Sequence, residues 1–282
     1  MRRLFGNVVC LLMILSGGAI AQTDAGPQFE VASIKPAAPD ARGMFIRTTP
    51  GGRVNITNMT LKELMVIAWR IQPFQISGGP AWLDSARYDI TAKPETSPKQ
   101  GEIPLMLQSL LADRFQLTIH RETKELSLYA LVMAKKDGKL GPGLTESKEG
   151  SCAAPDPSKA PPPPQPGKPP ALWCGGMMMS PRRLTAVSVP VANLTPMLSR
   201  LLARTVVDKT GLTGKFDISM EWTPDETQAM QLAPGAPTPP PSDFTGPSIF
   251  TALQEQLGLK LESQKGPVEI FVIERAEKPS EN

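Results

Sequence analysis

The stretch Arg87-Tyr88-Asp89-Ile90 returns in the second half of the chain as Lys215-Phe216-Asp217-Ile218. Other motifs recur around it in the same order: Gly43-Met44-Phe45-Ile46 matches Gly176-Met177-Met178-Met179, and Met106-Leu107-Gln108-Ser109-Leu110-Leu111 matches Ala252-Leu253-Gln254-Glu255-Gln256-Leu257. Because only loop-sized insertions shift the register between the halves, the sequence predicts two copies of one supersecondary unit.

Local patterns predict the elements of each copy. In the first copy, a short strand at 28–34 is followed by a hairpin of two extended runs and then by a helix that starts at the capping box Thr60-Leu61-Lys62-Glu63. The hairpin is the start of the repeated unit. Two further strands, a second helix from Pro104 and two closing strands at 115–119 and 126–134 follow, the last two joined by a polar connection at 120–125. The second copy repeats this series and ends in strands at 259–262 and 268–274. We therefore expect an α+β fold, a tandem duplication of a β-β-α-β-β-α-β-β unit with two helices on a small mixed sheet per copy.

Composition along the chain predicts the domain boundaries. We expect a signal peptide at 1–21, a first α+β repeat at 28–137, a proline-rich linker at 138–175, a second α+β repeat at 176–276 with a proline-rich insertion at 223–247, and a polar tail at 277–282.

The N-terminus has the layout of a secretory signal peptide: Arg2-Arg3, an apolar stretch, and Ala19-Ile20-Ala21 before Gln22. A retained membrane anchor is the alternative, but the apolar run from Val8 to Ser16 is too short to cross ~30 Å of hydrocarbon. We expect a mature chain that begins near Gln22, has no membrane span, and is periplasmic or secreted.

Charge argues against nucleic acid as a partner. Removing the two arginines of the signal peptide from the 30 basic residues leaves 28, against 27 acidic ones. A net charge so close to zero does not favour binding to nucleic acid or to an anionic membrane surface.

Two cysteines, Cys152 and Cys174, flank the most proline-rich run of the chain. In an oxidising compartment such a pair is expected to form a disulfide. The alternative is a redox or metal pair, which is typical of a close C-x-x-C spacing with basic or histidine neighbours, and these are absent from this sequence.

Motifs of both halves resemble known families. Val206-Val207-Asp208, Gly214-Lys215-Phe216-Asp217-Ile218 and Leu257-Gly258-Leu259 resemble the short N-terminal domain of secretins and TonB-dependent receptors. The resemblance implies a periplasmic docking and signalling module.

Nearly the whole mature chain is similar to an uncharacterised family of exported proteins expanded in soil bacteria, classed as a domain of unknown function. The motifs that carry this resemblance include Phe29-Glu30-Val31-Ala32-Ser33-Ile34-Lys35-Pro36 and Asp208-Lys209-Thr210-Gly211-Leu212-Thr213-Gly214.

Residues that could carry chemistry are few. His120 is the only histidine, and the chain has no G-x-S-x-G nucleophile elbow, so we expect no catalytic residues, no metal and no cofactor. Met177-Met178-Met179 is a candidate copper(I) site, but its match to Met44-Phe45-Ile46 favours a strand. Asp208-Lys209-Thr210-Gly211 resembles an aspartic-protease loop, but Lys209 separates the aspartate from the threonine, which favours a turn.

Two functional hypotheses remain. The first is a non-enzymatic interaction or docking module of the bacterial envelope that binds a protein or peptide by strand addition at an exposed sheet edge. The alternative is a secreted hydrolase or a glycan- or peptide-binding protein that uses a ligand loop formed by Trp82, Asp84, Arg87 and Asp89.

Overall fold

The computed structural model describes residues 26–49, 51–99, 101–153, 172–180, 182–225 and 246–280. The predicted signal peptide lies outside the described residues, as do most of the predicted proline-rich linker and most of the insertion at 223–247.

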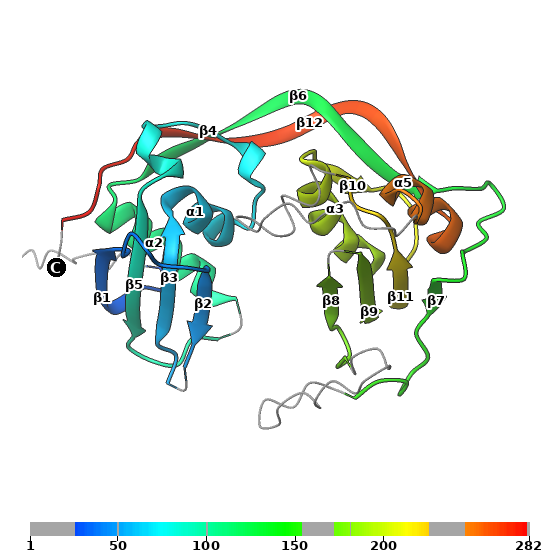
Figure 1. Cartoon of the computed structure of the whole chain (residues 1–282), viewed down its shortest axis with the longest axis horizontal. Coiled ribbons are helices and arrows are strands. Elements are labelled where there is room, and N and C mark those ends of the chain that lie inside the picture. The colour runs from blue at the N-terminus through cyan, green and yellow to red at the C-terminus, as the bar shows by residue number, and fades with distance from the viewer. Residues whose placement is uncertain are drawn as a thin grey trace, which may run out of the picture.

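The first lobe is an antiparallel sheet with the strand order β1-β5-β3-β2, packed against two helices (Figure 1). Its elements are β1 (Phe29–Pro36), β2 (Phe45–Thr48), β3 (Val54–Thr60), α1 (Leu61–Trp69), η1 (Pro73–Gln75), β4 (Ile76–Gly78), η2 (Ala81–Asp84), β5 (Arg87–Pro94) and α2 (Glu102–Arg114). The capping box is present as predicted, since the Thr60 hydroxyl accepts from the Glu63 amide and the Glu63 carboxylate accepts from the Thr60 amide.

The second lobe has the sheet order β7-β11-β9-β8, also antiparallel throughout. Its elements are β7 (Leu144–Glu146), β8 (Met177–Ser180), β9 (Arg183–Val189), η3 (Val191–Asn193), α3 (Leu194–Leu202), β10 (Val206–Asp208), β11 (Phe216–Glu221), and α5 (Ile249–Ala252), which continues into the π-helical turn η4 (Leu253–Leu257). The Ser248 hydroxyl accepts from the Thr251 amide at the start of this last helix, and Gly258 ends the helix with φ 73°.

Two long strands, β6 (Thr118–Met133) and β12 (Leu259–Arg275), join the lobes as a ribbon that arches over both (Figure 1). They pair antiparallel from Leu259 opposite Met133 to Ile273 opposite Ile119. Short parallel strands extend the ribbon at each end, β10 beside β6 and β4 beside β12, so the mixed sheet is shared by the lobes rather than built within each of them.

The ribbon corrects the prediction of paired closing strands. Phe115 ends α2 and Gln116 takes φ 49°, so 115–117 is not a strand, and the supposed polar connection at 120–125 is the middle of β6. Similarly, the gap between the strands expected at 259–262 and 268–274 is paired residue by residue. Polar side chains are compatible with a strand here because the ribbon between the lobes exposes much of its surface to solvent.

The predicted linker was also wrong at its start, since Leu144–Glu146 forms the outer strand β7 of the second sheet. Gly141 and Gly143 donate to the carbonyls of Leu257 and Gln256 at the end of the last helix, at 3.0 and 2.7 Å. A β-carbon on Gly143 would lie 2.2 Å from the Ser219 carbonyl oxygen. The glycines therefore allow a close backbone approach that the sequence pattern of a linker conceals.

Each lobe has its own core. In the first, Ile34, Ile56, Leu64, Leu107 and Phe115 are among the fully buried side chains, and in the second Leu184, Leu198, Phe216 and Trp222 are. The side-chain amide of Gln72 donates to the Pro196 carbonyl of the second lobe at 3.2 Å, and the side-chain amide of Gln75 donates to the Glu269 carbonyl of the ribbon at 2.9 Å. The first lobe therefore contacts both the second lobe and the ribbon.

Cys152 and Cys174 form a disulfide, with their Cα atoms 5.3 Å apart. The Cys174 amide also donates to the Ala153 carbonyl at 2.9 Å, which places the two ends of the intervening segment side by side. The cysteine pair predicted from the sequence is thus joined.

We expect the free energy of unfolding of the double variant Cys152→Ser/Cys174→Ser to be lower by about 3 kcal/mol, because the cross-link joins residues 22 positions apart in the sequence. Urea titration of the oxidised protein and of the variant measures the difference. Two reactive thiols in the native protein purified without reductant would contradict the disulfide.

Candidate functional site

The free edge of the first sheet, at β2, is the candidate site. All four residues of β2 are exposed, and Phe45 and Ile46 keep 58% and 38% of their surface in solvent. Met44, just before the strand, is exposed as well. Large apolar side chains on a strand with one unpaired edge are unusual in a protein that binds nothing, because such edges attract other strands.

The register of the β2–β3 hairpin shows which main-chain groups are free. The Thr49 amide donates to the Arg53 carbonyl at 2.9 Å, and the register places Arg47 opposite Asn55. Hydrogen-bonded pairs alternate in an antiparallel ladder, so Phe45 and Arg47 bond to β3 while Ile46 and Thr48 direct their N–H and C=O groups outward. The outward groups form a short template for an added strand.

The opposite edge of the same sheet, β1, is protected. The Arg114 guanidinium of α2 donates to the outward carbonyl of Ala32 at 3.0 Å, and β1 ends at Pro36, which has no N–H to offer. A proline and a covering side chain are common ways to block an edge strand. The first sheet is therefore open on one side only, at β2.

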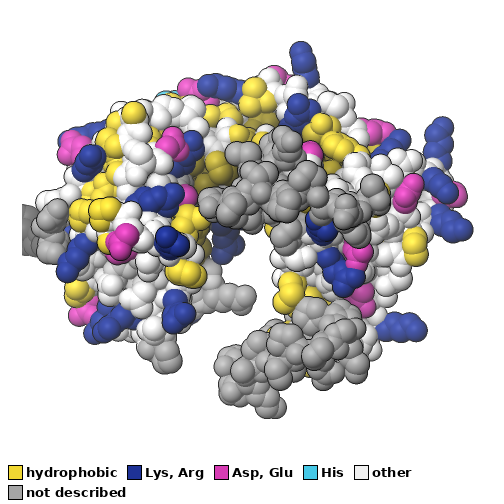
Figure 2. Space-filling model, in the orientation of Figure 1, with side chains coloured by type: hydrophobic (Ala, Val, Ile, Leu, Met, Phe, Trp, Pro, Cys, Tyr) yellow, Lys and Arg dark blue, Asp and Glu magenta, His cyan; other side chains and the backbone are white. Residues whose placement is uncertain are grey.

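The corresponding edge of the second sheet is β8. Figure 1 shows β2 and β8 as the innermost strands of their sheets, facing the space between the lobes, and Figure 2 shows a gap between the lobes at their ends away from the ribbon. β8 is less accessible, because Met177 and Met179 pack against the core and only Met178 and Ser180 are exposed. The candidate copper site Met177-Met178-Met179 is thus a strand of the sheet.

The four residues of the predicted ligand loop have separate contacts. Trp82 packs against the core of the first lobe, and Asp84 forms an ion pair with Lys62 at 3.0 Å. Arg87 donates to the Asn58 carbonyl at 2.7 Å and lies 3.4 Å from a Glu63 oxygen. Asp89 accepts from the Asn58 amide at 2.8 Å. Arg87 and Asp89 are brought together at Asn58, while Trp82 and Asp84 serve other contacts.

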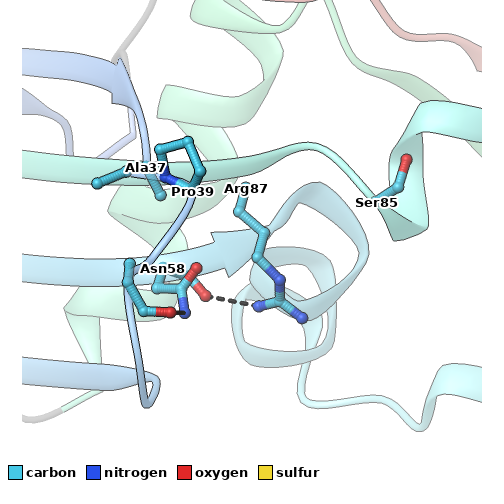
Figure 3. A pocket seen from close by; sticks show the side chains of 7 residues that line it. Ala37, Pro39, Asn58, Ser85 and Arg87 are labelled. Atoms are coloured by element: carbon cyan, nitrogen blue, oxygen red, sulfur yellow. Dashed lines mark hydrogen bonds between the residues drawn. The ribbon is translucent and has the colours of Figure 1, made fainter.

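A pocket of about 350 Å³ lies beside Arg87 and Asn58, under the loop that follows β1. In Figure 3, Arg87 and Asn58 point toward one another, and Ser85 lies apart from them. The Asn58 side chain donates to the carbonyls of Ala41 and Gly43, at 3.2 and 3.0 Å. These bonds tie the polar groups of the pocket to the loop that leads into β2, so the pocket supports the position of the edge strand.

Asp89 and Asp217, which occupy the same position in the two repeated motifs, each accept a hydrogen bond from a backbone amide at a β-bulge of the neighbouring strand. Asn58 and Ser188 lie in left-handed conformations, with φ 56° and 55°, where the ladders to β5 and β11 shift register. Asp89 accepts the Asn58 amide, and Asp217 accepts the Ser188 amide at 2.9 Å together with the Ser147 hydroxyl. The carboxylates therefore pair amides that the bulges leave without a ladder partner. The repeated motif drew attention to both aspartates in the sequence. The bulges, which explain their role, have no signal in the sequence.

The remaining candidate residues also lie in structural settings. Asp208 accepts from the Thr210 amide and hydroxyl at 2.8 and 2.7 Å, the bonding pattern of an aspartate turn. His120 lies on the exposed ribbon, where its Nδ1 contacts Glu274 at 2.8 Å and its Nε2 contacts Glu122 at 2.9 Å. It faces two carboxylates instead of a hydroxyl or thiol. Among the described residues no cluster of three metal-binding side chains is found.

We expect Asp89→Ala to lower the free energy of unfolding by about 1–3 kcal/mol, because the Asn58 amide loses a charged acceptor. Asp217→Ala should cost more, because Asp217 accepts two bonds. Urea denaturation measures both, and Asp89→Asn, which keeps an acceptor oxygen, is the matched control. Equal stability of the alanine and asparagine variants would contradict this role.

The pKa of His120 is raised above its ordinary value, chiefly by the hydrogen bond to Glu122 and further by Glu274. The pKa of Glu122 is lowered, first by Lys124 and then by His120. A raised histidine pKa adds stability below the ordinary value, which is lost as the pH rises through the raised one. NMR titration of His120 should show the raised pKa, and Glu122→Gln should reduce it. Glu262→Gln, whose residue pairs with Lys260 elsewhere on the ribbon, should leave the titration unchanged.

None of the helices in the described part of the chain is long and apolar enough to cross a membrane.

Comparison with known proteins identifies the family of the chain. No curated protein and no solved structure gives a significant match. The family model described as protein of unknown function (DUF3738) matches residues 62–276, which contain all of the elements from α1 to β12 apart from the first residue of α1. The chain therefore belongs to the DUF3738 family of proteins of unknown function.

Proposed function

We propose that this protein is an exported, non-enzymatic interaction module of the bacterial envelope that binds an extended segment of a partner protein at the free edge of β2. The observation that carries the proposal is the combination of outward main-chain groups at Ile46 and Thr48 with exposed apolar side chains on the same strand. Strand addition obtains affinity from main-chain hydrogen bonds and specificity from alternate side chains, and it needs no catalytic residue.

The protection of the opposite edge of the sheet, at β1, supports the choice of β2. A sheet that is blocked at β1 by Arg114 and Pro36 but open at β2 can accept a partner on one side only, which gives a defined complex in place of open-ended assembly. The hydrogen bonds of Asn58 to the preceding loop hold the start of β2 in place before a partner arrives.

The contacts of the ligand-loop residues favour docking over a hydrolase or a glycan-binding protein. A catalytic or sugar-binding loop needs side chains that are available to a ligand, whereas Asp84, Arg87 and Asp89 already bond to Lys62, Glu63 and Asn58.

We further infer that the two lobes descend from one duplicated unit. The strand order of the two sheets matches position by position, β1-β5-β3-β2 with β7-β11-β9-β8. The hydrogen bonds Asp89–Asn58 and Asp217–Ser188 lie between matching strands of the two sheets. The resemblance of the second half to the periplasmic docking domain of secretins and TonB-dependent receptors agrees with an exported docking role, as does a disulfide, which persists in oxidising compartments.

The test replaces Ile46 by proline, which removes an outward N–H but leaves the bonds from Phe45 and Arg47 to β3 in place. The mature protein, tagged and expressed in its native host, is cross-linked in the envelope, and captured proteins are identified by mass spectrometry. We expect one reproducible partner with the wild type and at least tenfold less of it with Ile46→Pro, since losing main-chain pairing of about 1.4 kcal/mol or more lowers affinity tenfold.

Two variants control this experiment. Ala32→Pro removes an outward N–H from the protected edge β1 and should capture the partner normally, while Ile46→Val keeps the N–H of β2 with a similar side chain and should also bind. Thermal unfolding of all variants shows that they are folded. Capture that is equal with Ile46→Pro and the wild type would rule out strand addition at β2.

A further inference from the structure

We propose that the segment bound at β2 is acidic: an added strand whose aspartate or glutamate side chain lies opposite Arg47 and whose aromatic or β-branched side chain lies opposite Phe45. The inference rests on the proposed strand addition at β2 and names the chemistry of the strand. It follows from the charges of the hairpin and from the faces that its side chains occupy.

The β2–β3 hairpin carries positive charge without compensation. Arg42, Arg47 and Arg53 are exposed, and the sequence has no acidic residue from Ala41 to Lys62. Within the described part of the chain, no ion pair joins any of these arginines to a carboxylate. Glu63 is the first acidic residue after the hairpin in the sequence, and it already forms an ion pair with Arg87.

The second sheet shows the contrast. Arg183, at the start of β9 beside the edge strand β8, forms an ion pair with Glu221 of β11. The arginine next to the less accessible edge is thus neutralised within the protein, whereas Arg47 on the open edge is not. An acidic partner strand supplies the missing charge.

The pleat of β2 fixes where the partner's side chains matter. Arg47 lies opposite Asn55 and Phe45 opposite Thr57, on the solvent face of the sheet, while Ile46 lies opposite the buried Ile56 on the other face. Because Ile46 and Thr48 would make the hydrogen bonds to an antiparallel added strand, Phe45 and Arg47 fall in the non-hydrogen-bonded pairs, where facing side chains are closest. Opposite charges and aromatic or β-branched pairs are the favourable choices at such positions.

A second copy of this chain fits the edge less well. Its own β2 hairpin would bring the same three arginines and no carboxylate from 41–62 to the interface. Like charges that face one another across a strand pair are destabilising. Charge therefore favours a different, acidic segment and opposes self-assembly through β2.

The experiment uses two synthetic peptides of equal length, one alternating valine with glutamate and one alternating valine with lysine, each with a fluorescent label. In each peptide a tyrosine replaces one charged residue, so that the tyrosine and a charged residue stand two positions apart on one face, as Phe45 and Arg47 do. Fluorescence polarisation with the mature protein measures both affinities at low and at physiological salt. We expect the glutamate peptide to bind about three- to tenfold more tightly than the lysine peptide, and the preference to weaken with salt. Arg47→Glu should reverse the preference.

Lys265→Glu is the control for net charge, because it makes the same change of charge at an exposed position in the middle of the ribbon, away from β2. It should leave the preference unchanged. Both substitutions lie on exposed side chains, and equal melting temperatures show that the fold is intact.

The outcomes separate the two proposals. Binding of both peptides with equal affinity, abolished by Ile46→Pro, would keep strand addition and overturn the acidic preference. Binding of the glutamate peptide that responds to Arg47→Glu but not to Ile46→Pro would show charge attraction without strand addition and overturn both. Absence of binding by either peptide would overturn the inference, while capture of a native partner that is lost with Ile46→Pro would still support the proposed function.

Discussion

The continuous antiparallel pairing of β6 with β12 is the constraint on which the rest of the structure depends. Each strand starts in the lobe of its own half and ends in the other, where it pairs with a short strand of that half: β6 with β10, and β12 with β4. Neither half of the chain therefore contains all the strands next to its own lobe. Such exchange couples the two cores, because separating the lobes would require breaking the ribbon itself.

The ribbon does not cover the outer strands of the two lobe sheets, and these edges differ in how accessible they are to an added strand. At β1 an arginine from α2 and a terminal proline block addition, and at β8 the side chains alternate between core and solvent. At β2 all four side chains are exposed, and Arg47 forms no ion pair with a carboxylate of the described residues. Unprotected apolar edges carry a risk of aggregation. An open edge on a sheet whose opposite edge is protected therefore indicates that the open edge has a function.

The aspartates show how a repeated polar motif can serve architecture. Asp89 and Asp217 each follow a buried aromatic residue, Tyr88 or Phe216, and each accepts an amide at a bulge of the neighbouring strand. The aromatic ring fills the core while the carboxylate satisfies the backbone, so a two-residue motif fixes both packing and register. Sequence reasoning found the motif but assigned Asp89 to a ligand loop, because the bulge at Asn58 leaves no pattern in the residues near Asp89.

Local features of this protein were determined by the sequence: the capping box at Thr60, the helices with one apolar face, the hairpins, the glycine at the end of the last helix, and the cysteine pair. These depend on neighbours within a few residues, where spacing and backbone preference are sufficient. Only the tertiary structure decided that 120–125 is a strand, that Leu144–Glu146 joins the second sheet, and that β2 is the open edge. Each of these depends on which distant strand supplies or fails to supply a hydrogen-bonding partner, and a strand's partner is set by contacts far apart in the chain that no local pattern records.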